Sequence, residues 1–275
     1  MARLNRQSVW KRYDRPSNAA RNVILTVFAL FLALPIVGML YFTFRSATGG
    51  FTLDHWLDLF AGERSSSWMA LEDGLINSIV LVLVTIAIEY VIVIPALVLI
   101  DVRFPQIKRY MRIFMLLPIA IPAIILVVGF APIFSVLSNL FSADVWTLAL
   151  AYGIIALPFV YTTIEADLSG MNAATLAQAA ESLGAGWWRI LVSIMLPCLR
   201  RSIVSATLIT SAIVLGEFTI ASLLNRETLQ TDLIVISKSD VYVSVIITLI
   251  VLVLTFMALF LVSGAGKNHK ERKQS

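Results

Sequence analysis

The sequence predicts an all-α membrane protein, because its composition is strongly apolar and its apolar residues form long continuous runs. Of the 275 residues, 59% are hydrophobic and only 14% are charged, with a mean hydropathy of +0.88. A soluble domain carries about a quarter charged residues. Runs of about 20 residues are long enough for an α-helix to cross a bilayer. Six such runs are predicted to be transmembrane helices, at residues 23–44, 76–100, 113–130, 145–164, 203–224 and 241–262.

A single membrane domain is expected, since no linker or low-complexity stretch interrupts these runs. Residues 1–22 form an N-terminal arm, residues 23–264 form the membrane domain with a core at about 74–263, and residues 265–275 form a tail. The first run is longer than the apolar region of a signal peptide, so we interpret it as an uncleaved helix.

The basic residues predict the orientation in the membrane. Of the 21 Lys and Arg residues, only Arg45, Arg64, Arg226 and Lys238 fall on one side of the predicted topology. By the positive-inside rule, both termini and the polar segment between the fourth and fifth helices are cytoplasmic. The chain is therefore predicted to be a multi-pass protein of the cytoplasmic (inner) membrane. Its basic balance indicates contact with anionic membrane lipid and gives no support to nucleic-acid binding.

The segment between the first and second helices is the longest on the predicted external side. Apolar residues recur there at helical spacing, which predicts a short amphipathic helix, and they are Leu53, Trp56, Leu57, Leu59 and Phe60. Two interpretations remain open for this helix. It either anchors the chain at the membrane interface through aromatic residues, or it contacts an external protein.

The third run carries Pro118 and Pro122, followed by Gly129 and Pro132. An interior proline removes a backbone hydrogen bond and kinks a helix, so we expect this helix to be bent or hinged. The bend is either a packed kink or part of a gate.

The polar segment after the fourth run is predicted to form a short helix, because residues 173–188 are mostly good helix formers. Gly184 is expected to end this helix, since glycine adopts backbone angles closed to other residues. Trp187 and Trp188 mark the return to the membrane interface, and Pro197 restricts how the next helix begins. Small residues would let another surface approach closely, and they are Ala174, Ala177, Ala179 and Ala180.

Two acidic residues lie inside predicted membrane helices, where an ionisable side chain is costly unless it faces a cavity or a partner. Glu217 is a candidate for contact with a cationic substrate or an external binding protein, and the alternative is a structural hydrogen bond to a neighbouring helix. Glu89 lies beside Tyr90 and either lines a path or pairs with a polar group in the bundle. Together with Pro118 and Pro122, these acids are candidates for a translocation path.

A family resemblance is carried by two stretches of the polar segment, Gln178-Ala179-Ala180-Glu181-Ser182-Leu183-Gly184 and Ile194-Met195-Leu196-Pro197. Their spacing resembles the Glu-Ala-Ala, Gly, Ile-x-Leu-Pro signature of the permease subunits of ATP-binding-cassette (ABC) importers. Gln178 stands where the family usually has Glu. The resemblance extends to Asn77-Ser78, Leu117-Pro118, Leu157-Pro158-Phe159-Val160 and Gly216-Glu217-Phe218.

This resemblance implies a type I ABC importer permease fold with six transmembrane helices and a cytoplasmic coupling helix between helices 4 and 5. The implied partners are a cytoplasmic ATPase dimer, a second permease in a homo- or heterodimer, and an extracytoplasmic substrate-binding protein. ATP would be bound by the ATPase partner, with no cofactor, metal or catalytic residue on this chain. The implied ATPase-coupling residues are Gln178, Ala179, Ala180, Leu183, Gly184, Ile194, Leu196 and Pro197.

The substrate expectation rests on residues 216–224, which resemble permeases that import polyamines, ferric iron, phosphonates or thiamine. Spermidine or putrescine is the first expectation, and the other three classes are alternatives. An enzyme is not expected, because His55 and His269 lie outside the predicted helices and form no zinc or triad motif. An ATP-independent secondary transporter remains a further alternative, and it would need no ATPase partner.

Overall fold

The computed structural model describes residues 17–46, 49–60, 65–141 and 144–271. Within these ranges the chain is nearly all helical, and the β-structure consists of an isolated antiparallel bridge between Arg45 and Phe51. The predicted all-α class is therefore confirmed. Residues 1–16 of the predicted N-terminal arm and residues 272–275 of the predicted tail lie outside the described residues.

The helices are named here in chain order, and labels beginning with η mark short 3₁₀ or π-helical turns. The elements are α2 (Asn18–Thr43), α3 (Asp54–Phe60), α4 (Ser65–Ile88), η1 (Glu89–Val93), α5 (Ile94–Arg103), η2 (Pro105–Ile107), α6 (Lys108–Ala120), α7 (Ala123–Leu140), η3 (Val145–Leu148), α8 (Ala149–Gly170), α9 (Ala173–Ser182), α10 (Trp187–Ile190), η4 (Leu191–Met195), α11 (Leu196–Gly216), α12 (Thr219–Leu223), α13 (Leu229–Ser239) and α14 (Val241–Glu271).

Five helical stretches in the described part of the chain are long and apolar enough to cross a membrane. They are Asn18–Thr43, Leu71–Arg103, Ala123–Leu140, Val145–Gly170 and Trp187–Gly216. The first part of α14, Val241–Met257, is apolar but shorter. A short helix is present between the first two spans as α3. Of its predicted apolar residues, Leu59 is buried, whereas Leu53 and Leu57 are exposed.

A π-helical turn lies inside two of these spans, and a proline follows each turn. The turn η1 precedes Pro95, and the turn η4 precedes Pro197. A proline ring clashes with the carbonyl four residues earlier and has no N–H to donate. The wider π turn accommodates both defects without ending the helix. Pro197 therefore lies inside a continuous helix from Trp187 to Gly216.

The prediction of one continuous third helix at residues 113–130 is wrong. Ile121 is extended, with φ −97° and ψ 121°, and it separates α6 from α7. A proline disfavours the helical conformation in the residue before it, which explains the break at Ile121 ahead of Pro122. Pro118 is tolerated inside α6. The expected bend is confirmed at Pro122, and the membrane-length helix is α7.

The predicted fifth helix, 203–224, is displaced. The continuous helix begins at Trp187 and ends at Gly216, after which Glu217 is extended with ψ 128°. The short α12 follows as a separate element. The apolar composition of residues 216–224 concealed this interruption.

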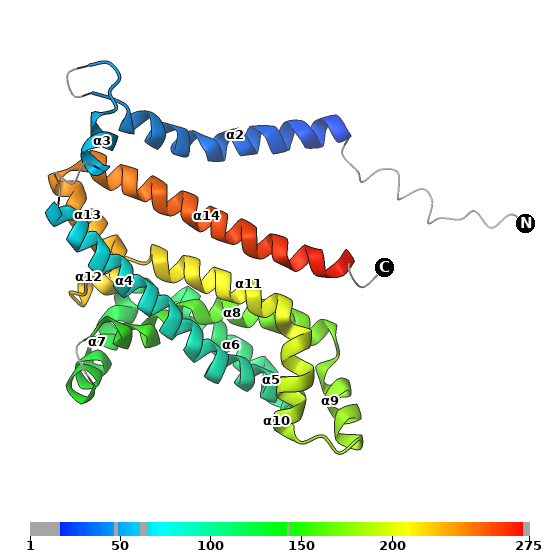
Figure 1. Ribbon diagram of the computed structural model, residues 1–275. Coiled ribbons are helices and arrows are strands. Elements are labelled where there is room, and N and C mark those ends of the chain that lie inside the picture. Colours follow the sequence, from blue (N-terminus) through cyan, green and yellow to red (C-terminus); the bar gives the residue numbers. More distant parts are fainter. Residues whose placement is uncertain (1–16, 47–48, 61–64, 142–143, 272–275) are drawn as a thin grey trace, which may run out of the picture.

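Figure 1 shows how the helices are arranged. The helices α8 and α11 pack side by side at the centre, and α2 lies along α14. At one end, which we call the α9 end, α9 and α10 project from the bundle. The helices α3, α12 and α13 lie at the opposite end, which we call the α13 end. The start of α2 and the end of α14 point toward the α9 end, so both lie on the same side as the polar segment.

Three clusters of buried side chains hold the described elements together. The first joins α5, α8, α9 and α11 at the α9 end, the second joins α4, α7, α8 and α12, and the third joins α3, α4, α13 and α14. Because lipid is as apolar as these side chains, close packing and polar contacts hold the membrane-spanning part together. The ring of Tyr242 on α14 stacks on Phe42 at 4.9 Å and on His55 at 3.8 Å, which ties α2 and α3 to α14.

Candidate functional site

The predicted coupling helix is present as α9, and its end is built as the sequence indicates. The N–H of Gly184 donates to the carbonyl of Glu181 at 2.8 Å, and the N–H of Ala185 donates to the carbonyl of Ala180 at 3.0 Å. These two bonds form a Schellman motif, which requires a left-handed residue after the helix. Gly184 supplies it with φ 81°. The prediction that Gly184 ends this helix is confirmed.

The inner face of α9 is made of alanines that pack against this chain itself. Ala173, Ala177 and Ala180 are buried in the core cluster at the α9 end, together with side chains of α5 and α8. This placement corrects the expectation that Ala177 and Ala180 offer a small-residue face to another protein. Their small side chains instead let α9 lie close to α5, because alanine allows two helix backbones to approach closely.

The outer face of α9 is open. Gln178, Ala179 and Gly184 are exposed, and Leu183 is 89% exposed at the tip of the segment. A leucine left so open in water is unfavourable by about 1.5–3 kcal/mol relative to a buried one. The exposed tip is therefore suited to contact with a protein surface.

The second half of the predicted coupling set lies in η4 and the start of α11. Ile194 and Leu196 are half-buried and pack against the same core cluster, whereas Pro197 is exposed. Ile194 and Leu196 therefore contact the same core cluster as the buried alanines of α9. They connect the segment to α11 through an unbroken helix.

An ion pair connects α9 to the end of the membrane span Leu71–Arg103. The guanidinium Nη2 of Arg103, at the end of α5, lies 2.5 Å from Oε1 of Glu181 on α9. Glu181 belongs to the signature stretch but was not predicted to be a contact residue. The pair is partly exposed, so it contributes about 1 kcal/mol or less to stability and mainly orients α9 on α5.

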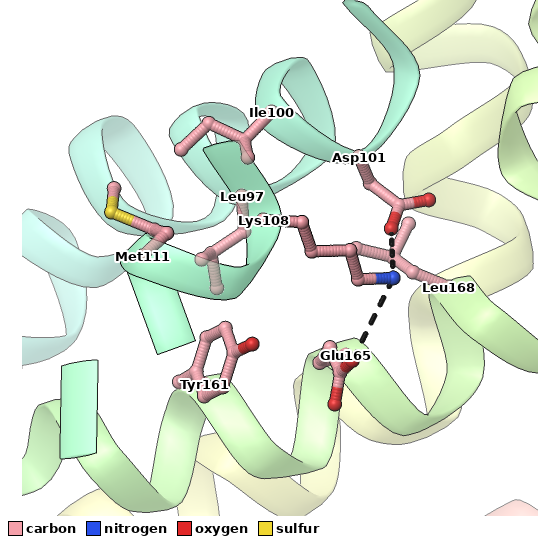
Figure 2. A pocket seen from close by; sticks show the side chains of 8 residues that line it. All are labelled: Leu97, Ile100, Asp101, Lys108, Met111, Tyr161, Glu165 and Leu168. Atoms are coloured by element: carbon pink, nitrogen blue, oxygen red, sulfur yellow. Dashed lines mark hydrogen bonds and ion pairs between the residues drawn. The ribbon is translucent and has the colours of Figure 1, made fainter. Parts of the chain in front are cut away.

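A charged cluster beside α9 was not predicted (Figure 2). The Nζ of Lys108 on α6 lies 2.5 Å from Oδ1 of Asp101 on α5, 3.0 Å from Oγ of Ser169 and 3.6 Å from Oε1 of Glu165 on α8. Arg112 also contacts Glu165, at 2.7 Å. Burial lowers the pKa of Lys108, but its hydrogen bond to Asp101 and the nearby carboxylates together raise that pKa above its ordinary value. The cluster ties α5, α6 and α8 together.

A signal for this cluster exists in the sequence. Asp101 comes directly after the predicted run 76–100, and Glu165 comes directly after the predicted run 145–164. Acidic residues at the ends of two apolar helices, together with the basic stretch from Lys108 to Arg112, indicate ion pairing at one membrane surface.

Glu89 and Glu217, the two acids predicted to lie on a translocation path, differ from each other in their surroundings. Glu89 is only 2% exposed, and the Thr210 hydroxyl of α11 lies 2.7 and 2.9 Å from its two carboxyl oxygens. Next to it, the Tyr90 hydroxyl lies 2.9 Å from that of Thr207. Glu89 therefore pairs with a polar group in the bundle, which was the second of its two interpretations.

Glu217 makes a local structural contact. Its carboxylate accepts from the backbone N–H groups of Thr219 at 2.7 Å and Ile220 at 3.0 Å. It thereby satisfies free N–H groups at the start of α12, where a negative charge is also favoured by the helix dipole. These two bonds are within its own segment, whereas the structural alternative had supposed a hydrogen bond to a neighbouring helix. The Tyr152 hydroxyl of α8 also interacts with this carboxylate.

The fold and the α9 segment together define a multi-pass helical membrane protein that carries a short, open helix between two spans. Residues 102–267 match the family described as binding-protein-dependent transport system inner membrane component. The match covers more than half of the chain, and the chain belongs to this family. It is thus a permease component of an ABC importer. A comparison with curated proteins found no match.

Proposed function

We propose that this chain forms the translocation path of an ABC importer across the cytoplasmic membrane, with α9 docking on a cytoplasmic ATPase. The observation that carries the proposal is the geometry of α9. Its inner alanine face is anchored to α5 and its outer face, with Gln178, Ala179, Leu183 and Gly184, is open. In this proposal the α9 end is cytoplasmic, as the basic residues predict.

A displacement of α9 would be transmitted to the membrane-spanning helices through two connections. Arg103 links Glu181 to α5, and α10, η4 and α11 form one continuous helix from Trp187 to Gly216. A helix transmits displacement along its length because its backbone is internally hydrogen-bonded. Closure of two ATPase subunits would therefore shift α5 and α11 together and switch the path between inward-facing and outward-facing states. ATP would be bound and hydrolysed by the ATPase partner.

In this proposal the path is completed by a second permease, either a second copy or a different chain. The breaks at Ile121 and Glu217 are where α6, α7, α11 and α12 would hinge. Pro122 and Glu217 are accordingly assigned to hinges, Pro118 to the last turn of α6 before the break, and Glu89 to the contact between η1 and α11. The α13 end would receive the extracytoplasmic substrate-binding protein.

For the substrate, we propose a small cationic solute such as spermidine or putrescine, on the resemblance of residues 216–224. An open cavity of about 490 Å³ at the α13 end supports this class. Its lining includes the acidic residues Asp144 and Glu227 and the ring of Trp146, with Arg226 as its basic residue. Carboxylates and an aromatic face both favour an organic cation.

A pull-down of the full chain tests the docking role. Leu183→Asp places a charge on the exposed tip without entering a packed region, so the variant should assemble in the membrane and lose the co-purifying ATPase. Leu57→Asp is the control, because Leu57 is also exposed (64%) but lies on α3 at the opposite end. Normal ATPase recovery and uptake with Leu183→Asp would refute docking through α9. A transport-competent complex without any ATPase would favour a secondary transporter.

The substrate is tested separately, by uptake of labelled putrescine into cells that express the importer. Competition by spermidine, and none by ferric iron, thiamine or a phosphonate, is the expected result. Competition by one of the last three alone would reassign the substrate and leave the docking role unaffected.

A further inference from the structure

A basic hollow lies at the surface of α6, close to the charged cluster. It has a volume of about 260 Å³ and is lined by Lys108, Arg109 and Arg112. These three cations occupy the first and second turns of a 13-residue helix whose N-terminus has no side-chain cap. Cations are unfavourable at this position, because the helix dipole already places positive charge at the N-terminus.

The carboxylates nearby balance only part of this charge. Asp101 and Glu165 contact Lys108, and Glu165 also contacts Arg112. The three cations therefore outnumber the two carboxylates, which leaves one positive charge in excess. Arg109 is exposed, and its guanidinium extends the positive charge of the hollow outward. The hollow is thus electrostatically suited to an anion.

The residues next to these cations in the sequence are largely apolar and exposed. They lie before η2, on η2 and on α6, and they are Phe104 (49%), Ile107 (46%), Tyr110 (65%), Ile113 (61%) and Phe114 (67%). In a membrane protein such a belt lies where hydrocarbon meets the headgroups. An anion reaching this hollow would therefore be accompanied by apolar chains.

We propose that Lys108, Arg109 and Arg112 form a binding site for the phosphate headgroup of an anionic membrane lipid. The guanidinium groups of Arg109 and Arg112 donate to the phosphate oxygens, since arginine matches phosphate geometry with paired N–H groups. The acyl chains lie against Ile113 and Phe114. This site is independent of the proposed docking and substrate roles, because it uses neither α9 nor the α13 end.

Native mass spectrometry of the detergent-purified full chain tests the site. The probes are dioleoyl-phosphatidylglycerol and dioleoyl-phosphatidylcholine, and the constant for binding the first lipid is measured for each. We expect phosphatidylglycerol to bind more tightly. Arg109→Gln should weaken its binding about five-fold, the effect of one basic residue near a lipid surface. Arg109→Lys should weaken it less, because lysine keeps the positive charge but lacks the paired N–H groups.

The matched control is Arg45→Gln, which removes an exposed cation at the α13 end. It should leave the binding constant unchanged. An unchanged constant with Arg109→Gln, or an equal loss with Arg45→Gln, would overturn the proposal. Displacement of the lipid by inorganic phosphate in millimolar excess would overturn it as well, because the hollow would then be a site for soluble phosphate.

Discussion

Gly184 adopts a positive φ in open surroundings, with no heavy atom within 4 Å of where a Cβ would stand. A side chain there meets no clash, so the whole cost of a substitution is backbone strain. We expect Gly184→Ala to lower the free energy of unfolding by about 1–2 kcal/mol and to fray the end of α9. Hydrogen exchange of the Gly184 and Ala185 amides in the purified chain checks this.

Gly186 provides the control for that substitution. It is two residues away and also has open space, but its φ is −76°, an angle that alanine adopts freely. Gly186→Ala should leave stability unchanged or raise it slightly. Equal losses of unfolding free energy from both substitutions would show that the positive φ of Gly184 does not explain its effect.

Thr210 carries the hydrogen bond to Glu89 inside the bundle. Thr210→Val keeps the shape of the side chain but leaves a buried carboxyl group without this donor. An unsatisfied buried polar group costs about 1–3 kcal/mol, so we expect that loss in thermal unfolding of the detergent-purified chain. The control is Thr163→Val, since the Thr163 hydroxyl only donates to the carbonyl of Phe159 in its own helix. Equal effects of the two changes would refute a special role for the Glu89 contact.

Asp232 on α13 predicts a pH dependence of stability. Burial raises its pKa to about 6, and the charge of Glu227 adds to the effect. Because the folded state then holds this proton at higher pH than the unfolded state does, stability should fall as pH rises from about 4 to about 6 and stay level above. Unfolding midpoints across this range, compared with Asp232→Asn, test it. A variant with the same pH profile would contradict the assignment.

Between elements, the contact of α4 with α13 depends on the absence of a side chain at Gly74. A Cβ there would collide with the carboxylate of Asp232 and lie 3.1 Å from the backbone of Thr228. Gly74→Ala should therefore separate α4 from α13 and lower the thermal midpoint. The control is Gly153→Ala, which meets nothing within 4 Å and should stabilise α8, since alanine favours helix. A higher midpoint for Gly74→Ala would contradict the close packing described here.

The sequence predicted helical elements well where a local signal exists. Length and hydropathy located the runs, helix propensity and Gly184 located α9, and the proline at 122 located the bend. It predicted the boundaries poorly at residues 113–130 and 203–224, because composition does not report a local break such as those at Ile121 and Glu217.

What the sequence could not supply is which face of an element turns inward. The alanines of α9 were expected to meet another protein, yet Ala177 and Ala180 pack inside this chain. Helical spacing places them on one face, but only the position of α5 decides what that face contacts. The pairing of Arg103 with Glu181 joins residues far apart in sequence and has no local signal.

Over the whole molecule, the open outer face of α9 and the helix running from Trp187 to Gly216 connect one end of the bundle to its interior (Figure 1). Photo-crosslinking from this face in intact membranes tests whether it contacts the ATPase. A photo-reactive phenylalanine analogue replaces Leu183, Gln178 or, as the control at the other end, Leu57. We expect an ATPase adduct from positions 183 and 178 and none from 57. Complexes that contain the ATPase but give no adduct from 183 or 178 would contradict coupling through α9.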